Sequence, residues 1–433
     1  MTTDEKDYCV QVSPVDLVMC FSNTTDLVSS EVANHQQQVA YIASGIAAEM
    51  GLSREPQADV SLAGAVHDFG ALSLQERLEC LDFEVESPHH HSESAYLLLR
   101  EFAPFARIAE IIRHHHLPWN QGAGMTRFGK PVPLASHILH CADRIAVLLH
   151  KGRGATNQVD YVYRMIRPKI GTAFAPDIVE AFFELAGRNY FWFDLDAPYL
   201  SAVIAERSAH QGLDLDLDGL VAIGRLFGHA IDFRSRYTAV HSSGTAAVAE
   251  WLAARMGMAP AACRMMSVAG HMHDFGKLAI SREILDKPGR LDEGEMNEVK
   301  KHPYYAHRLL DPLKSLRTIN EWVSFHHERL DGKGYPFGLR GNDIPLGARI
   351  MAVGDIFTAL TEDRPYRAGM GAEQALRILE ENVDEGALDA DVVAILRGSF
   401  DEVDEVRRTA QREGFGEYEE FTTFLAATVA STQ

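Results

Sequence analysis

The segment His273-Asp274-Phe275-Gly276 occurs a second time in this 433-residue chain, at residues 67–70. A histidine precedes each copy by 32 residues, His241 before the C-terminal copy and His35 before the N-terminal one. Equal spacings over such a distance are typical of an internal duplication, in which each repeat is one structural unit. The sequence therefore predicts two copies of one domain.

Apolar residues recur at helical spacing along most of the chain, for example at Val39, Ile42 and Ile46, which favours amphipathic helices. Alternating strand patterns are scarce. We therefore predict an all-α fold with two tandem helical bundles. The expected segments are a first domain over 15–205, a second domain over 220–405, and a helical tail over 406–433.

The composition limits the classes of partner. Lysine and arginine number 41 and aspartate and glutamate 61, so the net charge is −20, which argues against binding to DNA or to an anionic membrane surface. The five cysteines are scattered and form no Cys-x-x-Cys pair, which disfavours a thiolate metal site and fits a reducing compartment. No apolar run approaches the roughly 20 residues that span a bilayer. We predict a cytoplasmic protein without a DNA or membrane partner.

Seven histidines and aspartates of the second copy are candidate ligands of one metal centre. Imidazole and carboxylate without thiolate suit iron, manganese, zinc or nickel. Seven ligands are too many for one four-coordinate ion, but they suit two ions about 3.5–4 Å apart, which together activate water and clamp a phosphoryl group. Metal-dependent hydrolysis of a phosphodiester follows. The candidates are His241, His273, Asp274, His302, His326, His327 and Asp355.

Adjacent ligands need a special place in a helix. Neighbours on a helix diverge by about 100°, so His273 and Asp274 converge on one site only near a helix end, and we expect Gly276 to be the glycine that caps it. The doublet His326-His327 runs into a glycine- and proline-rich loop at residues 332–336. That loop carries one cation and one aromatic ring, which suits an anionic ligand that contains a ring.

Five sequence blocks of the second copy stand in a characteristic order: His273–Lys277, Lys287–Gly289, His302-Pro303, His326–Pro336 and Arg364–Arg367. Together they resemble the HD-GYP family, bacterial cyclic dinucleotide phosphodiesterases within the HD superfamily. The resemblance covers about residues 232–393 and implies HD-type helical bundles, a centre of two or three metal ions, often iron, and hydrolysis of cyclic di-GMP.

The resemblance also implies roles for single residues. The seven candidates become metal ligands, and Asp274 with Lys277 form the catalytic pair, with Lys277 neutralising the scissile phosphate. Three-metal members carry a glutamate four residues before the first histidine, where this chain has Tyr237. We therefore expect two divalent ions, iron first and manganese or nickel as alternatives. The residues implied in substrate binding are Lys333, Tyr335, Arg364 and Arg367.

The first copy keeps a full set of candidate ligands but loses the reacting groups. Ala71 stands where the second copy has Lys277, and no Gly-Tyr-Pro loop or arginine pair follows. We predict a second metal site without chemistry; the alternative is that these histidines simply lie in solvated loops. The candidates are His35, His67, Asp68, His91, His114, His115 and Asp143.

Other readings of the function remain open at this point. The substrate could be cyclic GMP-AMP or a linear dinucleotide instead of cyclic di-GMP, because base contacts depend on loop geometry. A protein that binds a cyclic dinucleotide without hydrolysing it, and signals through a homodimer or a partner protein, is the alternative from another class. Turnover with saturating metal separates the enzyme from the receptor.

Overall fold

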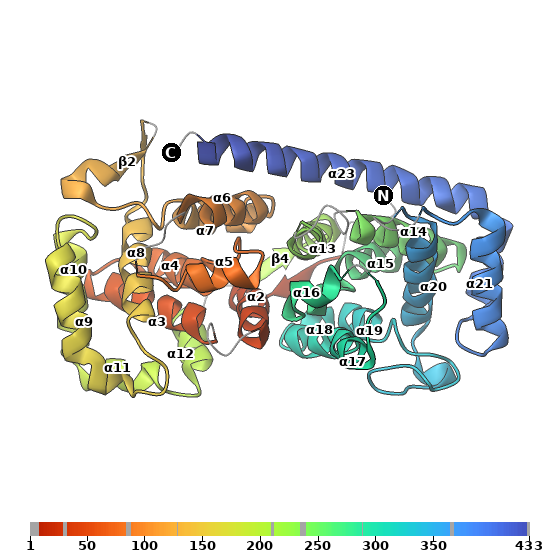
Figure 1. Ribbon diagram of the computed structural model, residues 1–433, viewed down its shortest axis with the longest axis horizontal. Coiled ribbons are helices and arrows are strands. Elements are labelled where there is room, and N and C mark those ends of the chain that lie inside the picture. The colour runs from red at the N-terminus through yellow and green to blue at the C-terminus, as the bar shows by residue number, and fades with distance from the viewer. Residues whose placement is uncertain are drawn as a thin grey trace. The chain divides into compact units, whose positions relative to one another are not determined.

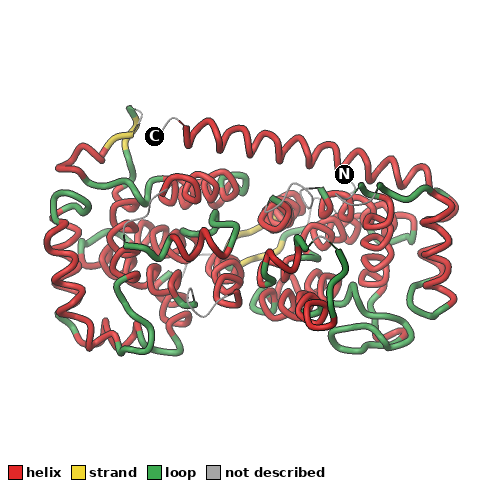
Figure 2. Tube along the Cα trace, in the orientation of Figure 1, coloured by secondary structure: helices red, strands yellow, loops and turns green. Residues whose placement is uncertain are grey.

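The computed structural model of the protein describes residues 8–28, 33–83, 88–127, 129–208, 212–233, 240–287, 289–363 and 368–430. Helices dominate throughout (Figures 1 and 2), so the predicted all-α class is confirmed. The chain divides into two compact units, one of Ser13–Leu213 with Phe424–Gln433 and the other of Met1–Val12 with Asp214–Thr423. None of the described helices has the length and apolar character needed to cross a membrane.

The N-terminal unit is a bundle of helices with one small hairpin. Strands β2 (Thr126–Arg127) and β3 (Lys130–Pro131) pair antiparallel in a loop before helix α8. Its helices are α2 (Pro14–Val28), α3 (His35–Glu49), α4 (Arg54–Val66), α5 (Leu74–Glu79), α6 (Pro88–Leu99), α7 (Ala106–Arg113), α8 (Leu134–Val147), α9 (Val159–Ile166), α10 (Pro176–Ala186), α11 (Asn189–Leu195) and α12 (Leu200–Arg207).

The C-terminal unit repeats this arrangement. Strand β1 (Val10–Val12) pairs with β4 (Leu213–Leu215), a two-stranded element that the sequence analysis did not foresee. The expected tail is the end of one helix, α23 (Phe400–Ala430). The other helices are α13 (Leu217–Asp232), α14 (His241–Arg255), α15 (Pro260–Met272), α16 (Arg282–Leu285), α17 (Glu293–Val299), α18 (His302–Leu310), α19 (Arg317–Ser324), α20 (Leu346–Thr361), α21 (Ala372–Asp384) and α22 (Ala390–Gly398).

In each unit two successive helices pack almost backbone to backbone. A Cβ atom at Gly270 of α15 would lie 2.3 Å from the Cα of Ala246 on α14, and one at Gly64 of α4 would lie 2.7 Å from the Cα of Ala40 on α3. Such contacts exclude any larger side chain. The close packing places His241, at the start of α14, beside the His-Asp pair that follows α15. In the other unit it places His35, at the start of α3, beside the pair that follows α4.

Candidate metal centre

The seven predicted ligands of the C-terminal unit come together from five helices. His241 and His302 are the first residues of α14 and α18, His273 and Asp274 follow α15, His326 and His327 follow α19, and Asp355 lies within α20. All but one therefore stand at helix ends, where neighbouring side chains can point the same way. All are buried or half-buried.

Asp274 faces two groups of ligands with its two oxygens. Its Oδ2 lies 3.4 Å from Nε2 of His273 and 3.9 Å from Nε2 of His241. Its Oδ1 lies 3.5 Å from Nε2 of His302. A carboxylate placed in this way is suited to bridge two ions.

The remaining ligands complete two subsites, one on each side of Asp274. Asp355 closes the first, since its Oδ1 lies 3.2 Å from Nε2 of His241 and 3.7 Å from Nε2 of His273. The second consists of His302, His326 and His327, which offer nitrogens within 4.8 Å of one another. With Asp274 shared between them, both subsites contain the oxygen and imidazole donors that divalent transition metals accept.

Hydrogen bonds from Nδ1 to backbone carbonyls orient the histidine rings so that Nε2 points towards the centre. Nδ1 of His273 lies 2.7 Å from the carbonyl of Gly270, and Nδ1 of His326 lies 2.6 Å from the carbonyl of Val323. A ring that donates through Nδ1 presents an unprotonated Nε2 to a metal. Nε2 of His273 is buried, and no hydrogen bond within the described residues satisfies it. These observations fit a bound cation.

Burial and neighbouring charges keep three of the ligands, His302, His326 and Asp274, in their metal-binding forms. Burial lowers the pKa of His302 to about 3 and that of His326 to about 4. Burial alone would raise the pKa of Asp274, but His273 and Lys277 hold it well below its usual value. At neutral pH these two imidazoles are neutral and the carboxylate is ionised, as coordination requires.

Gly276 has a different role from the one expected. Gly276 does not have a positive φ, so it does not cap a helix in the left-handed conformation. A Cβ atom there would lie 1.9 Å from the carbonyl oxygen of His302, and one at Gly70 would lie 2.0 Å from that of His91. In both copies the glycine lets a later helix approach the His-Asp turn, α18 at Gly276 and α6 at Gly70, so that His302 or His91 reaches the cluster.

The structure brings two of the predicted substrate and catalytic residues to the cluster. Nζ of Lys277 lies 2.6 Å from Oδ2 of Asp274. The ring of Tyr335 lies 4.8 Å from that of His327, at 34°. Lys333 instead lies 78% exposed beside Asp331. Arg364 and Arg367 are outside the described residues, as is Tyr237.

Glu328, which the sequence analysis did not single out, holds the loop that carries Tyr335. Its buried carboxylate accepts hydrogen bonds from the backbone N–H groups of Phe337, at 2.7 Å, and Leu339, at 2.9 Å. The loop is thereby anchored beside the metal cluster on the side of His327.

The N-terminal unit contains a cluster of the same geometry. Oδ1 of Asp143 lies 3.3 Å from Nε2 of His35, and Oδ2 of Asp68 lies 3.2 Å from Nε2 of His67. The ring centroids of His67 and His115 are 5.3 Å apart, against 5.2 Å for His273 and His326. His115 therefore corresponds to His326.

This correspondence corrects the alignment of the histidine doublet. His116 takes the place expected for His115, with its Nε2 2.9 Å from Nε2 of His91, whereas His114 lies outside the cluster, beside Arg127. The loop before the last aspartate is one residue shorter in the first copy. The spacing from the preceding histidine gives the correct alignment, because 24 residues separate both His91 from His115 and His302 from His326.

The N-terminal cluster also has two neighbours that the other copy lacks. Sγ of Cys80 lies 3.6 Å from Nδ1 of His91, which is a thiol where the sequence analysis expected none. The guanidinium of Arg144 donates to Oδ2 of Asp143, at 2.6 Å, and to the carbonyls of Cys80, Asp82 and Phe83. The residue after Asp355 is Ile356. Arg144 thus fastens the segment 80–83 to the cluster.

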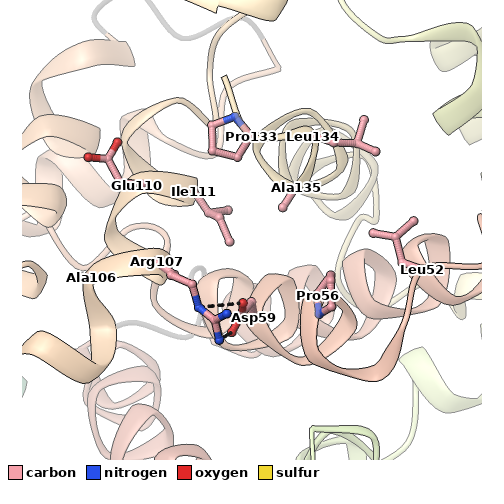
Figure 3. Close-up of a pocket in the computed structure, with 10 residues that line it drawn as sticks. All are labelled: Leu52, Pro56, Asp59, Ala106, Arg107, Glu110, Ile111, Pro133, Leu134 and Ala135. Carbon is pink, nitrogen blue, oxygen red and sulfur yellow. Dashed lines mark hydrogen bonds and ion pairs between the residues drawn. The ribbon is translucent and has the colours of Figure 1, made fainter. Parts of the chain in front are cut away.

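A cavity of about 580 Å³ lies elsewhere in the N-terminal unit (Figure 3). Apolar side chains such as Leu52, Ile111 and Leu134 contribute to its lining. The cation in its lining, Arg107, pairs with Asp59, at 3.3 Å between Nε and Oδ2. None of the cluster residues lines this cavity, so we do not regard it as the site of metal chemistry.

Comparison with known proteins gives matches to both copies. The family described as "HD domain" matches residues 226–392 and, in a second form, residues 32–148. A Vibrio cholerae protein named 3'3'-cGAMP-specific phosphodiesterase 1 is 28% identical over 386 residues, which are 87% of this chain and 89% of the relative. Another from that organism, 3'3'-cGAMP-specific phosphodiesterase 3, is 36% identical, over 64% of this chain and 60% of the relative.

Some relatives that match about a third of this chain carry another name. A protein of Pseudomonas aeruginosa named cyclic di-GMP phosphodiesterase is 40% identical over 146 residues, which are 34% of this chain and 35% of the relative. Among solved structures, a cyclic GMP-AMP specific phosphodiesterase of V. cholerae superposes with a TM-score of 0.61 at 25% identity. That likeness covers 91% of this chain and 98% of the other.

Proposed function

We propose, because this chain belongs to the HD-GYP family of HD-domain proteins, that its C-terminal domain is a metal-dependent phosphodiesterase that hydrolyses a cyclic dinucleotide. One observation carries the proposal. Asp274 faces His241 and His273 with one oxygen and His302 with the other, and it is buried and ionised within a set of imidazoles. That arrangement suits two ions side by side.

One set of residues would hold the ions, and a second set would bind the substrate. His241, His273 and Asp355 would hold one ion, the three histidines 302, 326 and 327 the other, and Asp274 would bridge them. Such a pair of ions, when bound, lowers the pKa of water and polarises a phosphoryl group. Two ions fit this donor set; iron, manganese and nickel all accept it.

The chain's own groups then position the substrate. Lys277 stands at Asp274 and brings a positive charge to the phosphoryl oxygens as negative charge grows on them. Tyr335, beside His327, offers an aromatic face on which a base can stack. Water adds to phosphorus, the bond from phosphorus to the ribose 3′ oxygen breaks, and that oxygen leaves with a proton.

Two substrates have support from different relatives. Two relatives named for 3'3'-cGAMP match 87% and 64% of this chain. The relative named for cyclic di-GMP is more similar in sequence, at 40%, but over 34% of the chain. Both contain guanine, and we propose that the substrate is one of these two cyclic dinucleotides.

The test is turnover by the full-length protein after its metals have been removed with a chelator and replaced one at a time. Cyclic di-GMP, 3'3'-cGAMP, cyclic di-AMP and a linear dinucleotide are offered separately, and products are separated by chromatography. We expect hydrolysis of a guanine-containing cyclic dinucleotide only after metal is restored. Tight binding of such a nucleotide without turnover under any metal would establish a receptor instead.

For the N-terminal copy we propose a metal site without hydrolytic activity. Five of its polar atoms are buried, and no hydrogen bond within the described residues satisfies them, as expected of ligands that lie ready for a cation. They are Nε2 of His35, His67 and His115, and Oδ1 of Asp68 and Asp143. Ala71 supplies no cation where the second copy has Lys277, and the segment held by Arg144 lies against the cluster.

Changing His67 and Asp68 together to alanine in the full chain should lower the metal content while turnover survives. The reason is that these two residues belong to the N-terminal cluster, whereas the reacting groups belong to the other copy. Metal per chain is measured by elemental analysis beside the rate of hydrolysis. An unchanged metal content would show that the N-terminal cluster binds no ion, and loss of turnover in a folded variant would assign it a part in the reaction.

A further inference from the structure

We propose that helix α23 sets the metal affinity of the His241 subsite through a relay of hydrogen bonds from Gln411 to Glu362 to His241. The inference rests on the proposed metal centre of the C-terminal domain. Glu362 and Gln411 are positioning residues in this relay. They act through His241 and contact neither the centre of the cluster nor the proposed substrate-binding residues.

His241 has an outer partner of a different kind from the other ligands. His273, His302 and His326 each donate through Nδ1 to a backbone carbonyl three residues earlier. Nδ1 of His241 instead faces a carboxylate, 3.1 Å from Oε2 and 3.2 Å from Oε1 of Glu362. A carboxylate in this position fixes the ring tautomer and strengthens Nε2 as a donor to metal.

Glu362 is itself held in place by the C-terminal helix. It follows the last turn of α20 and is 5% exposed. Nε2 of Gln411, on α23, lies 3.1 Å from Oε2, the same oxygen that lies 3.1 Å from His241. One carboxylate oxygen thus accepts from the metal ligand and from α23 together.

A buried ion pair fixes the direction of the Gln411 amide. Arg407 is paired with Asp404, one turn earlier on α23, at 2.6 Å between Nη2 and Oδ1. Arg407 also donates to Oε1 of Gln411. The guanidinium of Arg407 can only donate, so it must face the oxygen of the Gln411 amide. The NH₂ group of Gln411 therefore points towards Glu362.

The helix that begins with His241 makes room for this contact. A Cβ atom at Gly244, one turn along α14, would lie 2.8 Å from Nε2 of Gln411. A larger side chain at this position would displace the amide. Gln411 therefore packs across α14 directly beside the residue whose orientation it controls, and a shift of α23 would reach the metal ligand through two hydrogen bonds.

The relay is tested with Glu362→Ala, Glu362→Gln and Gln411→Ala in the full chain. Metal per chain and the dissociation constants for Mn²⁺ are measured by competition with a coloured chelator, and kcat and KM are measured with saturating Mn²⁺. Loss of an outer partner typically weakens metal binding by about 10–100-fold. We expect that loss for one ion in Glu362→Ala and a smaller loss in the same direction for Gln411→Ala.

Two variants separate the relay from a general structural effect. In Glu362→Gln a carbonyl oxygen can still accept at the Oε2 position although the negative charge is lost, so part of the affinity should return. Arg412→Ala removes an exposed contact with Glu405 on the same helix and should change neither affinity nor kcat. Wild-type affinity in Glu362→Ala, or equal losses in Glu362→Gln and Glu362→Ala, would overturn the relay. A wild-type protein that binds no Mn²⁺ would instead overturn the proposed metal centre.

Discussion

Replacing His273 and Asp274 together by alanine should abolish hydrolysis of the cyclic dinucleotide and remove the metal bound by the C-terminal domain. Asp274 is the carboxylate whose two oxygens face both groups of histidines, and no other described carboxylate of the cluster is within 4 Å of His302. Without Asp274 both subsites lose a ligand, and with His273 also replaced, four imidazoles are left with Asp355 as the remaining acidic ligand.

Elemental analysis and a turnover assay of the same preparation measure this outcome. The matched control is the double change of His67 and Asp68, which removes the equivalent pair from the other copy. A single Asp274→Asn variant keeps the shape and removes the charge, so it should also lose metal. Near-normal turnover with a full metal content in the His273 and Asp274 variant would show that the chemistry lies elsewhere.

The second large effect is expected from Lys277→Ala, which should keep both ions and lower kcat. A fixed cation that meets charge as it develops on the phosphoryl oxygens acts mainly in the transition state, and loss of one such group costs on the order of 100–1,000-fold. Nζ of Lys277 is already placed at the cluster, 2.6 Å from Asp274. The ligands themselves are unchanged in this variant.

Kinetic constants and metal content distinguish the roles that Lys277 could have. A lower kcat with unchanged metal content supports transition-state stabilisation. A rise in KM with kcat unchanged would make Lys277 a binding residue that favours substrate and transition state equally. Lys277→Arg keeps the charge but changes its shape, so it should recover part of the rate.

Much of the centre could be predicted because its ligands come from short local patterns. A histidine at the start of α14 and a His-Asp pair after α15 are brought together by two packed neighbouring helices, so their spacing survives in both copies. The fold class followed from the same helical periodicity. The His114 prediction failed because it was counted across a loop whose length differs between the copies; counted along the helices, the spacing identifies His115 and His116.

Other features leave no local pattern. Glu362 lies 121 residues from His241, and Gln411 lies 49 residues beyond Glu362, so each contact depends on how separate helices pack. The same is true of Arg144, which reaches the carbonyls of Cys80, Asp82 and Phe83 from the last turn of α8. The role of Gly276 was misjudged for a related reason, since its close neighbour is the backbone of His302 on another helix.

Gln411 lies outside the repeated segment of the sequence, although it contacts the outer partner of His241. The repeated pattern of the second copy stops near residue 405, yet Gln411, which holds the outer partner of the first metal ligand, lies beyond it on α23. A fragment ended at the repeat boundary would contain every metal ligand and would still lack this support. Under the proposed relay, the segment needed for function is longer than the repeated segment, and a recombinant enzyme, fusion or domain exchange should carry the C-terminal copy through at least Gln411.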